Sequence, residues 1–149
     1  MTQEPCLSEA LDAALSAPGT ATATSGDLTI EVEVKDVDRI GVVVDTIRVR
    51  GGSGSLHERA ERLAEAVRPD GHSLVPIEVD PRLGGGRLRS PVDHRRRYFE
   101  ANVTPAEVEL RRTQVLEDND RQPSELTVTR DQLGELVDQL EQAVAPLPE

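Results

Sequence analysis

The sequence predicts an α+β fold: an antiparallel sheet of roughly five to seven strands, with about three helices packed mainly on one face. Several segments alternate apolar and polar residues, and short turns join them, which is typical of an antiparallel sheet. Three other segments repeat apolar residues with helical spacing. A chain of 149 residues is expected to form a single domain over residues 1–149.

The strongest strand signal is a hairpin in the first third of the chain. Residues 28–35 alternate strictly between apolar and polar, residues 36–39 read as a turn, and residues 40–50 return as a second strand. The alternation slips by one residue near Asp45 and Thr46. A slip of this kind predicts a β-bulge in the returning strand.

Further strands are expected in the second half of the chain. The predicted ranges are 75–79, 87–90, 97–103, 108–115 and 126–128. Pro76 has no backbone N–H to donate, so the first of these strands is expected at an edge of the sheet. Residues 117–125 read as an acidic loop.

Three helices are predicted. Apolar residues spaced four apart indicate a helix over 7–17, and small polar residues follow to Gly26; we expect a flexible N-terminal helix and linker at 1–26. Helices over 56–67 and from Thr129 onward each begin with a capping-box pattern, Ser55 with Glu58 and Thr129 with Gln132.

Composition narrows the functional classes. The formal net charge is −11, so nucleic acid and anionic membranes are disfavoured as partners. Cys6 is the single cysteine, which excludes an internal disulfide and is typical of a reducing compartment. No signal peptide or membrane span is predicted. We therefore expect a cytoplasmic protein with no membrane partner, no metal and no cofactor.

One segment departs from the acidic balance. Residues 82–112 hold eight arginines against four carboxylates. The candidate binding residues in and beside it are Arg87, Arg89, Arg95, Arg96, Arg97 and Arg111. Strand phase places Phe99 in the core and Tyr98 on the opposite face with Glu100.

Three interpretations of these arginines remain open. The one we favour is internal ion pairing, in which Arg111 or Arg112 faces Glu100. The second is recognition of an acidic protein segment or a small phosphorylated ligand by arginine forks. The third, which we favour least, is nucleic-acid binding.

A Gly/Ser loop precedes the second helix. Ser53 and Ser55 lie in "GGSGS", at residues 51–55, where the N-terminus of a helix could attract an anion. The nucleotide-binding motif that ends in lysine is absent, and so is a complete nucleophile elbow. A catalytic role is therefore not favoured.

The leading functional hypothesis is a small protein-binding module, adaptor or chaperone-like. It would act through self-association as a homodimer or through an acidic protein partner at the Arg-rich strands. The alternative is an enzyme or sensor that binds a phosphorylated small molecule between residues 51–55 and the Arg-rich segment. In size, acidity and rough element order the chain is similar to small secretion-chaperone-like domains, which pair into dimers and hold client segments.

Overall fold

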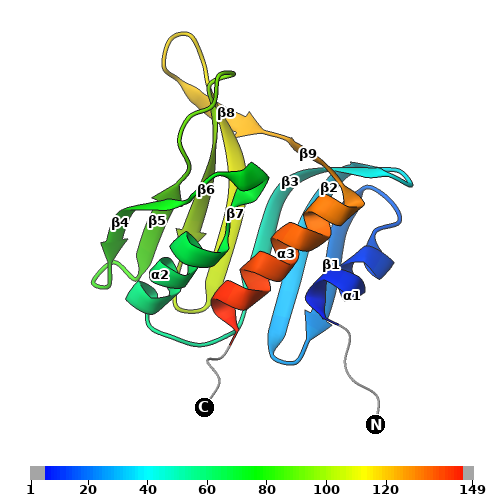
Figure 1. The fold of residues 1–149 in the computed structure, drawn as a ribbon, viewed down its shortest axis with the longest axis horizontal. Helices are drawn as coiled ribbons and strands as arrows, with labels where there is room; N and C mark the ends of the chain where they lie inside the picture. Colours follow the sequence, from blue (N-terminus) through cyan, green and yellow to red (C-terminus); the bar gives the residue numbers. More distant parts are fainter. Residues whose placement is uncertain (1–5, 146–149) are drawn as a thin grey trace.

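The computed structural model describes residues 6–145, and within that range it forms three α-helices and nine strands (Figure 1). The helices are α1 (Leu7–Ala14), α2 (Leu56–Ala66) and α3 (Arg130–Val144), with a 3₁₀ turn, η1, at Pro69–Gly71. The strands are β1 (Gly19–Ser25), β2 (Leu28–Val37), β3 (Gly41–Arg50), β4 (Val75–Asp80), β5 (Gly85–Arg89), β6 (Arg97–Val103), β7 (Glu107–Val115), β8 (Arg121–Ser124) and β9 (Leu126–Thr129). The predicted α+β class is confirmed.

All strand pairs are antiparallel, and seven strands follow the order β1-β2-β3-β7-β6-β5-β4. The two short strands extend this path, because β8 pairs with β7 and β9 pairs with β3. β3 thus has two partners along one edge. It pairs with β7 from Arg50 to Thr46 and with β9 from Val44 to Gly41. The sheet therefore divides where β7 parts from β3.

The three helices pack on one face of the sheet. α1 contacts β1 and β2, α3 contacts β3 and β9, and α2 contacts β4, β5 and β6 (Figure 1). The buried core lies between these helices and the inward-facing Val, Leu and Ile of the strands. Within residues 6–145 no helix covers the other face. We call these two sides the covered face and the open face.

Local sequence signals set several elements. The hydroxyl of Ser55 accepts a hydrogen bond from the backbone N–H of Glu58, and Thr129 and Gln132 form both bonds of a capping box. The predicted bulge is also confirmed. Val32 pairs with Ile47 and Val34 with Val44, so β3 carries one extra residue.

Two segments expected to be irregular are strands. Residues 20–26 were expected to be a connector, but Gly19–Ser25 form β1, which pairs with β2 and buries Ala21 and Ala23 under α1. Thr favours strands, and Ala is small enough to let α1 approach. Within the expected acidic loop, Arg121–Ser124 form β8. Both strands lack the bulky apolar alternation by which strands are recognised in a sequence.

Glycines fix the turn between β3 and α2. Gly52 has a φ of +84°, and a Cβ at this position would collide with the backbone carbonyl of Val144 at the end of α3. Gly84 has a similar φ of +73°, but a Cβ there would meet no atom within 4 Å. The two glycines therefore share a backbone conformation and differ in their surroundings.

We expect Gly52→Ala to lower the free energy of unfolding by about 3 kcal/mol, against about 1 kcal/mol for Gly84→Ala. Both variants strain a left-handed backbone, but only the first also displaces α3. Urea denaturation measures the difference. Equal losses in the two variants would contradict the close approach of the turn to α3.

Candidate functional site

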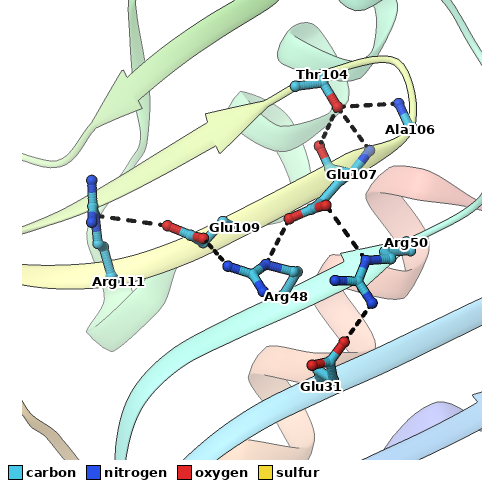
Figure 2. Close-up of polar contacts among 8 residues, drawn as sticks. All are labelled: Glu31, Arg48, Arg50, Thr104, Ala106, Glu107, Glu109 and Arg111. Atoms are coloured by element: carbon cyan, nitrogen blue, oxygen red, sulfur yellow. Dashed lines mark hydrogen bonds and ion pairs between the residues drawn. The ribbon is translucent and has the colours of Figure 1, made fainter.

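The open face carries a ladder of ion pairs. Arg48 on β3 lies between two acids of β7, with Nε 2.6 Å from an Oε of Glu107 and Nη2 2.5 Å from an Oε of Glu109. Arg50 joins Glu107 to Glu31 of β2. Figure 2 shows this chain of contacts crossing three neighbouring strands. It arises because antiparallel pairing puts directly opposite residues on the same face.

The ladder continues to a single buried carboxylate on β6. Arg111 joins Glu109 to Glu100, whose Oε1 is 3.9 Å from the Arg111 Nη2. The Nε atoms of Arg87 and Arg89 on β5 lie 3.7 Å and 3.0 Å from the Glu100 carboxylate oxygens. Glu100 is only 7% exposed. Three arginines from two neighbouring strands thus converge on one acid, as internal pairing predicts.

A fourth arginine reaches the same place from β8. The guanidinium of Arg121 lies over the ring of Tyr98, 5.6 Å from its centroid, and Arg89 lies 5.4 Å from the same centroid. These arginines border a shallow hollow of about 290 Å³. We call Arg87, Arg89, Arg111 and Arg121 the arginine quartet.

The quartet has an excess of positive charge. Three of its four guanidinium groups pair with Glu100, and each guanidinium has five N–H donors where a carboxylate offers two oxygens. Arg111 is shared with Glu109, but among the described residues no carboxylate forms an ion pair with Arg121. Many donors therefore point to solvent. This is the arrangement that binds carboxylate or phosphate oxygens through arginine forks.

Arg95, Arg96 and Arg97 are not part of the quartet. Arg95 and Arg96 lie in the turn before β6, and Arg97 is the first residue of that strand. Arg96 adopts a φ of +61° and donates to the side chain of Asn119. Arg97 points to the covered face in phase with Phe99. The predicted placement of Phe99 in the core and of Tyr98 on the opposite face with Glu100 agrees with the structure.

Asp93 holds this turn together. Its Oδ1 accepts hydrogen bonds from the backbone N–H groups of Arg95 and Arg97, both at 2.8 Å. Burial acts to raise the pKa of Asp93, but these bonds and the guanidinium groups of Arg97 and Arg112 outweigh it and lower the pKa. The charged carboxylate is therefore the form that stabilises the turn.

Ser53 and Ser55 line neither the hollow of the arginine quartet nor the pocket that Arg95 and Arg97 line. The Gly/Ser loop follows Arg50, which pairs with Glu107 at one end of β7, whereas Arg97 pairs with Gln114 toward its other end. Hydrogen bonds to other parts of the chain hold this loop in place. The backbone N–H of Ser53 donates to Val144, Arg62 donates to the Ser53 carbonyl, and Ser55 caps α2. Neither serine lines a described pocket.

Three arginines of the open face were not among the predicted site residues: Arg121, Arg48 and Arg50. Arg121 falls in a segment expected to be a loop, and no local pattern marks it. Arg48 and Arg50 carried a signal, since they alternate with apolar residues in a predicted strand. Their acidic partners on β7 could be named only once the register was known.

No cluster of three or more metal-ligating side chains occurs within residues 6–145. No helix in that range is long and apolar enough to cross a membrane. Comparison of the chain with known protein families, with curated proteins and with solved structures finds no match.

The pKa of Asp93 predicts a pH dependence of stability. The pKa of Asp93 in the folded protein lies below its unfolded value of about 3.9. The charged carboxylate therefore stabilises the fold at pH values above the unfolded pKa, and this stabilisation is lost as the pH falls through the folded pKa. We expect Asp93→Asn to cost about 1 kcal/mol near neutral pH, with the gap from the wild type closing in acid. Urea denaturation across this range measures it. Asp138→Asn, an exposed change of equal charge on α3, is the control, and an unchanged gap in acid would contradict the assignment.

Proposed function

We propose that this protein is a small protein-binding module, adaptor or chaperone-like, that holds an acidic segment of a partner protein on its open face. The observation that carries the proposal is the arginine quartet, three of whose members share one buried carboxylate, that of Glu100. An incoming carboxylate would find guanidinium donors that Glu100 leaves free. The single cysteine fits a cytoplasmic setting.

The edge of the sheet adds an apolar contact beside the quartet. Val75 on β4 pairs with Arg89 and therefore lies on the open face, where it is 51% exposed. β4 is the last strand of the main order, so an extended segment can lie against it. These features favour a segment that alternates acidic with apolar residues.

Protein is favoured over nucleic acid as the partner. The net charge of −11 repels a polyanion at long range, so only a short acidic segment in close contact benefits from the quartet. Tyr98 is 4% exposed and lies between Arg89 and Arg121. Its ring is therefore not available to stack on a base.

Binding of a fluorescent peptide of alternating Glu and Val residues, followed by anisotropy, tests the proposal. We expect Arg87→Gln/Arg111→Gln to weaken binding about ten-fold, because two exposed charge contacts are lost. Arg39→Gln/Arg82→Gln removes the same charge from surface turns and should change binding by less than about two-fold. If both double variants weakened peptide binding equally, the overall charge of the protein would explain the effect, and the proposal would be overturned.

Glu100→Gln should act in the opposite direction. Removing the carboxylate frees donors of three arginines, so the same peptide should bind about three-fold more tightly. Stability should fall by about 1–2 kcal/mol, because these arginines then repel one another without a counter-charge. Weaker peptide binding by a folded Glu100→Gln protein would contradict the proposed role of the quartet.

Sedimentation of the wild type at low and high salt separates a partner from self-association. A monomer under both conditions that binds the peptide supports a separate acidic partner. A dimer that is lost in Arg87→Gln/Arg111→Gln would make a second copy the occupant. Preference for a single-stranded nucleic acid over the peptide would assign the face to nucleic acid instead.

A further inference from the structure

The covered face holds a cleft where the sheet divides. Its volume is about 790 Å³, and it opens between η1 and α3, above the point where β7 leaves β3 and β9 replaces it. The residues that line it include Phe99, Arg97 and Arg112 at the floor and Asp70, Glu125 and Glu135 on the walls. A volume of this size is typical of small-molecule sites.

Two arginines in this cleft occupy positions that strand phase assigns to the core. On β7, Arg112 follows Val108 and Leu110 on the covered face, and on β6, Arg97 precedes Phe99 in the same phase. Apolar residues are expected at such positions. The guanidinium of Arg112 lies over the ring of its cross-strand neighbour Phe99, with Cζ 5.3 Å from the ring centroid.

These two guanidinium groups have too few acceptors. The side chains of Arg112 and Arg97 are 10% and 23% exposed, and both reach the same oxygen, Oδ2 of Asp93, at 3.6 Å and 3.5 Å. Charge-assisted hydrogen bonds are usually about 2.7–2.9 Å. The Nε atoms of both arginines are buried without a hydrogen-bond partner among the described residues.

The electrostatics of Arg112 agree with this shortage. Burial lowers its pKa, repulsion from Arg97 lowers it further, and the opposing attraction of Asp93 and Asp70 does not restore it. Buried charges are normally paired, because an uncompensated charge away from water is costly. Asp93 cannot neutralise two arginines, and its other oxygen is already held by backbone N–H groups.

We propose that this cleft binds a small molecule through a carboxylate group, which pairs with Arg97 and Arg112. The site lies on the face opposite the arginine quartet and is independent of the proposed function. Arginine forks bind carboxylates in two-point contacts. Leu126, Leu136 and Pro69, which also line the cleft, provide apolar surface for the body of the ligand.

The walls favour a carboxylate over a phosphate. Four arginines, Arg68, Arg95, Arg97 and Arg112, and three acids, Asp70, Glu125 and Glu135, line the cleft. The lining therefore has one excess positive charge, and a second negative charge on a ligand would have no counter-charge there. A ligand with a single carboxylate can therefore pair with Arg97 and Arg112 at the smallest cost in electrostatic repulsion. The backbone of Asp70 is held at a φ of +52°, a strained conformation of a kind that often occurs at ligand sites.

Titration of isotope-labelled protein with benzoate, followed through the arginine Nε–Hε signals in NMR spectra, tests this site. We expect the signals of Arg97 and Arg112 to shift and to saturate with a Kd of about 1 mM. Inorganic phosphate should bind at least about five-fold more weakly. Benzyl alcohol, which has the ring without the charge, should leave these signals unchanged.

Matched variants test whether benzoate binds in the cleft. Arg97→Gln should weaken benzoate binding about ten-fold, and Arg87→Gln, the same change in the quartet, should leave it unchanged. Val128→Trp on β9, which places a large ring on the covered face at the cleft without altering an arginine, should also abolish binding. The wild-type spectra decide the matter even if a variant fails to fold. Shifts confined to quartet arginines, or none up to saturating benzoate, would overturn the cleft site and leave the open-face proposal standing.

Discussion

The structure depends on one constraint, which is that helices cover a single face of a strongly alternating antiparallel sheet. Each strand must then send its apolar residues to the covered face and its polar residues to the open face. Arginine and glutamate are the main polar choices on the central strands, so the open face becomes a set of cross-strand charge pairs. The ion-pair ladder is a direct consequence of this alternation.

The ratio of acids to arginines along that ladder determines where binding can occur. Around β3, two arginines, Arg48 and Arg50, meet three acids, Glu31, Glu107 and Glu109, so no positive charge is in excess. Around β6 the ratio reverses, because three arginines of the quartet pair with Glu100 and the fourth, Arg121, lies over the neighbouring Tyr98. An acidic protein can thus carry a cationic hollow without a long basic run. The exposed ion pairs around β3 contribute little to stability. Their main effect is to neutralise the arginines there, so that the excess of positive charge is confined to the strands around β6.

Local signals in the sequence were sufficient for the fold class, and long-range pairing was needed for the site. The bulge near Asp45, the cap at Thr129 and the opposite placement of Tyr98 and Phe99 each follow from neighbouring residues, so the sequence could predict them. β1 was missed because Thr and Ala alternate too weakly in hydropathy. Arg121 and the division between β7 and β9 depend on which strands meet, and periodicity carries no such information.

The same phase argument separates the Arg-rich segment into two sites. Arg111 and Arg112 are consecutive on β7, so their side chains point to opposite faces, one to the quartet and the other to the cleft. Glu100 and Phe99, their partners on β6, are consecutive in the same way. A one-residue slip between β6 and β7 would move each arginine away from its partner and disrupt both sites together. The register of this pair of strands therefore positions the binding residues of both faces.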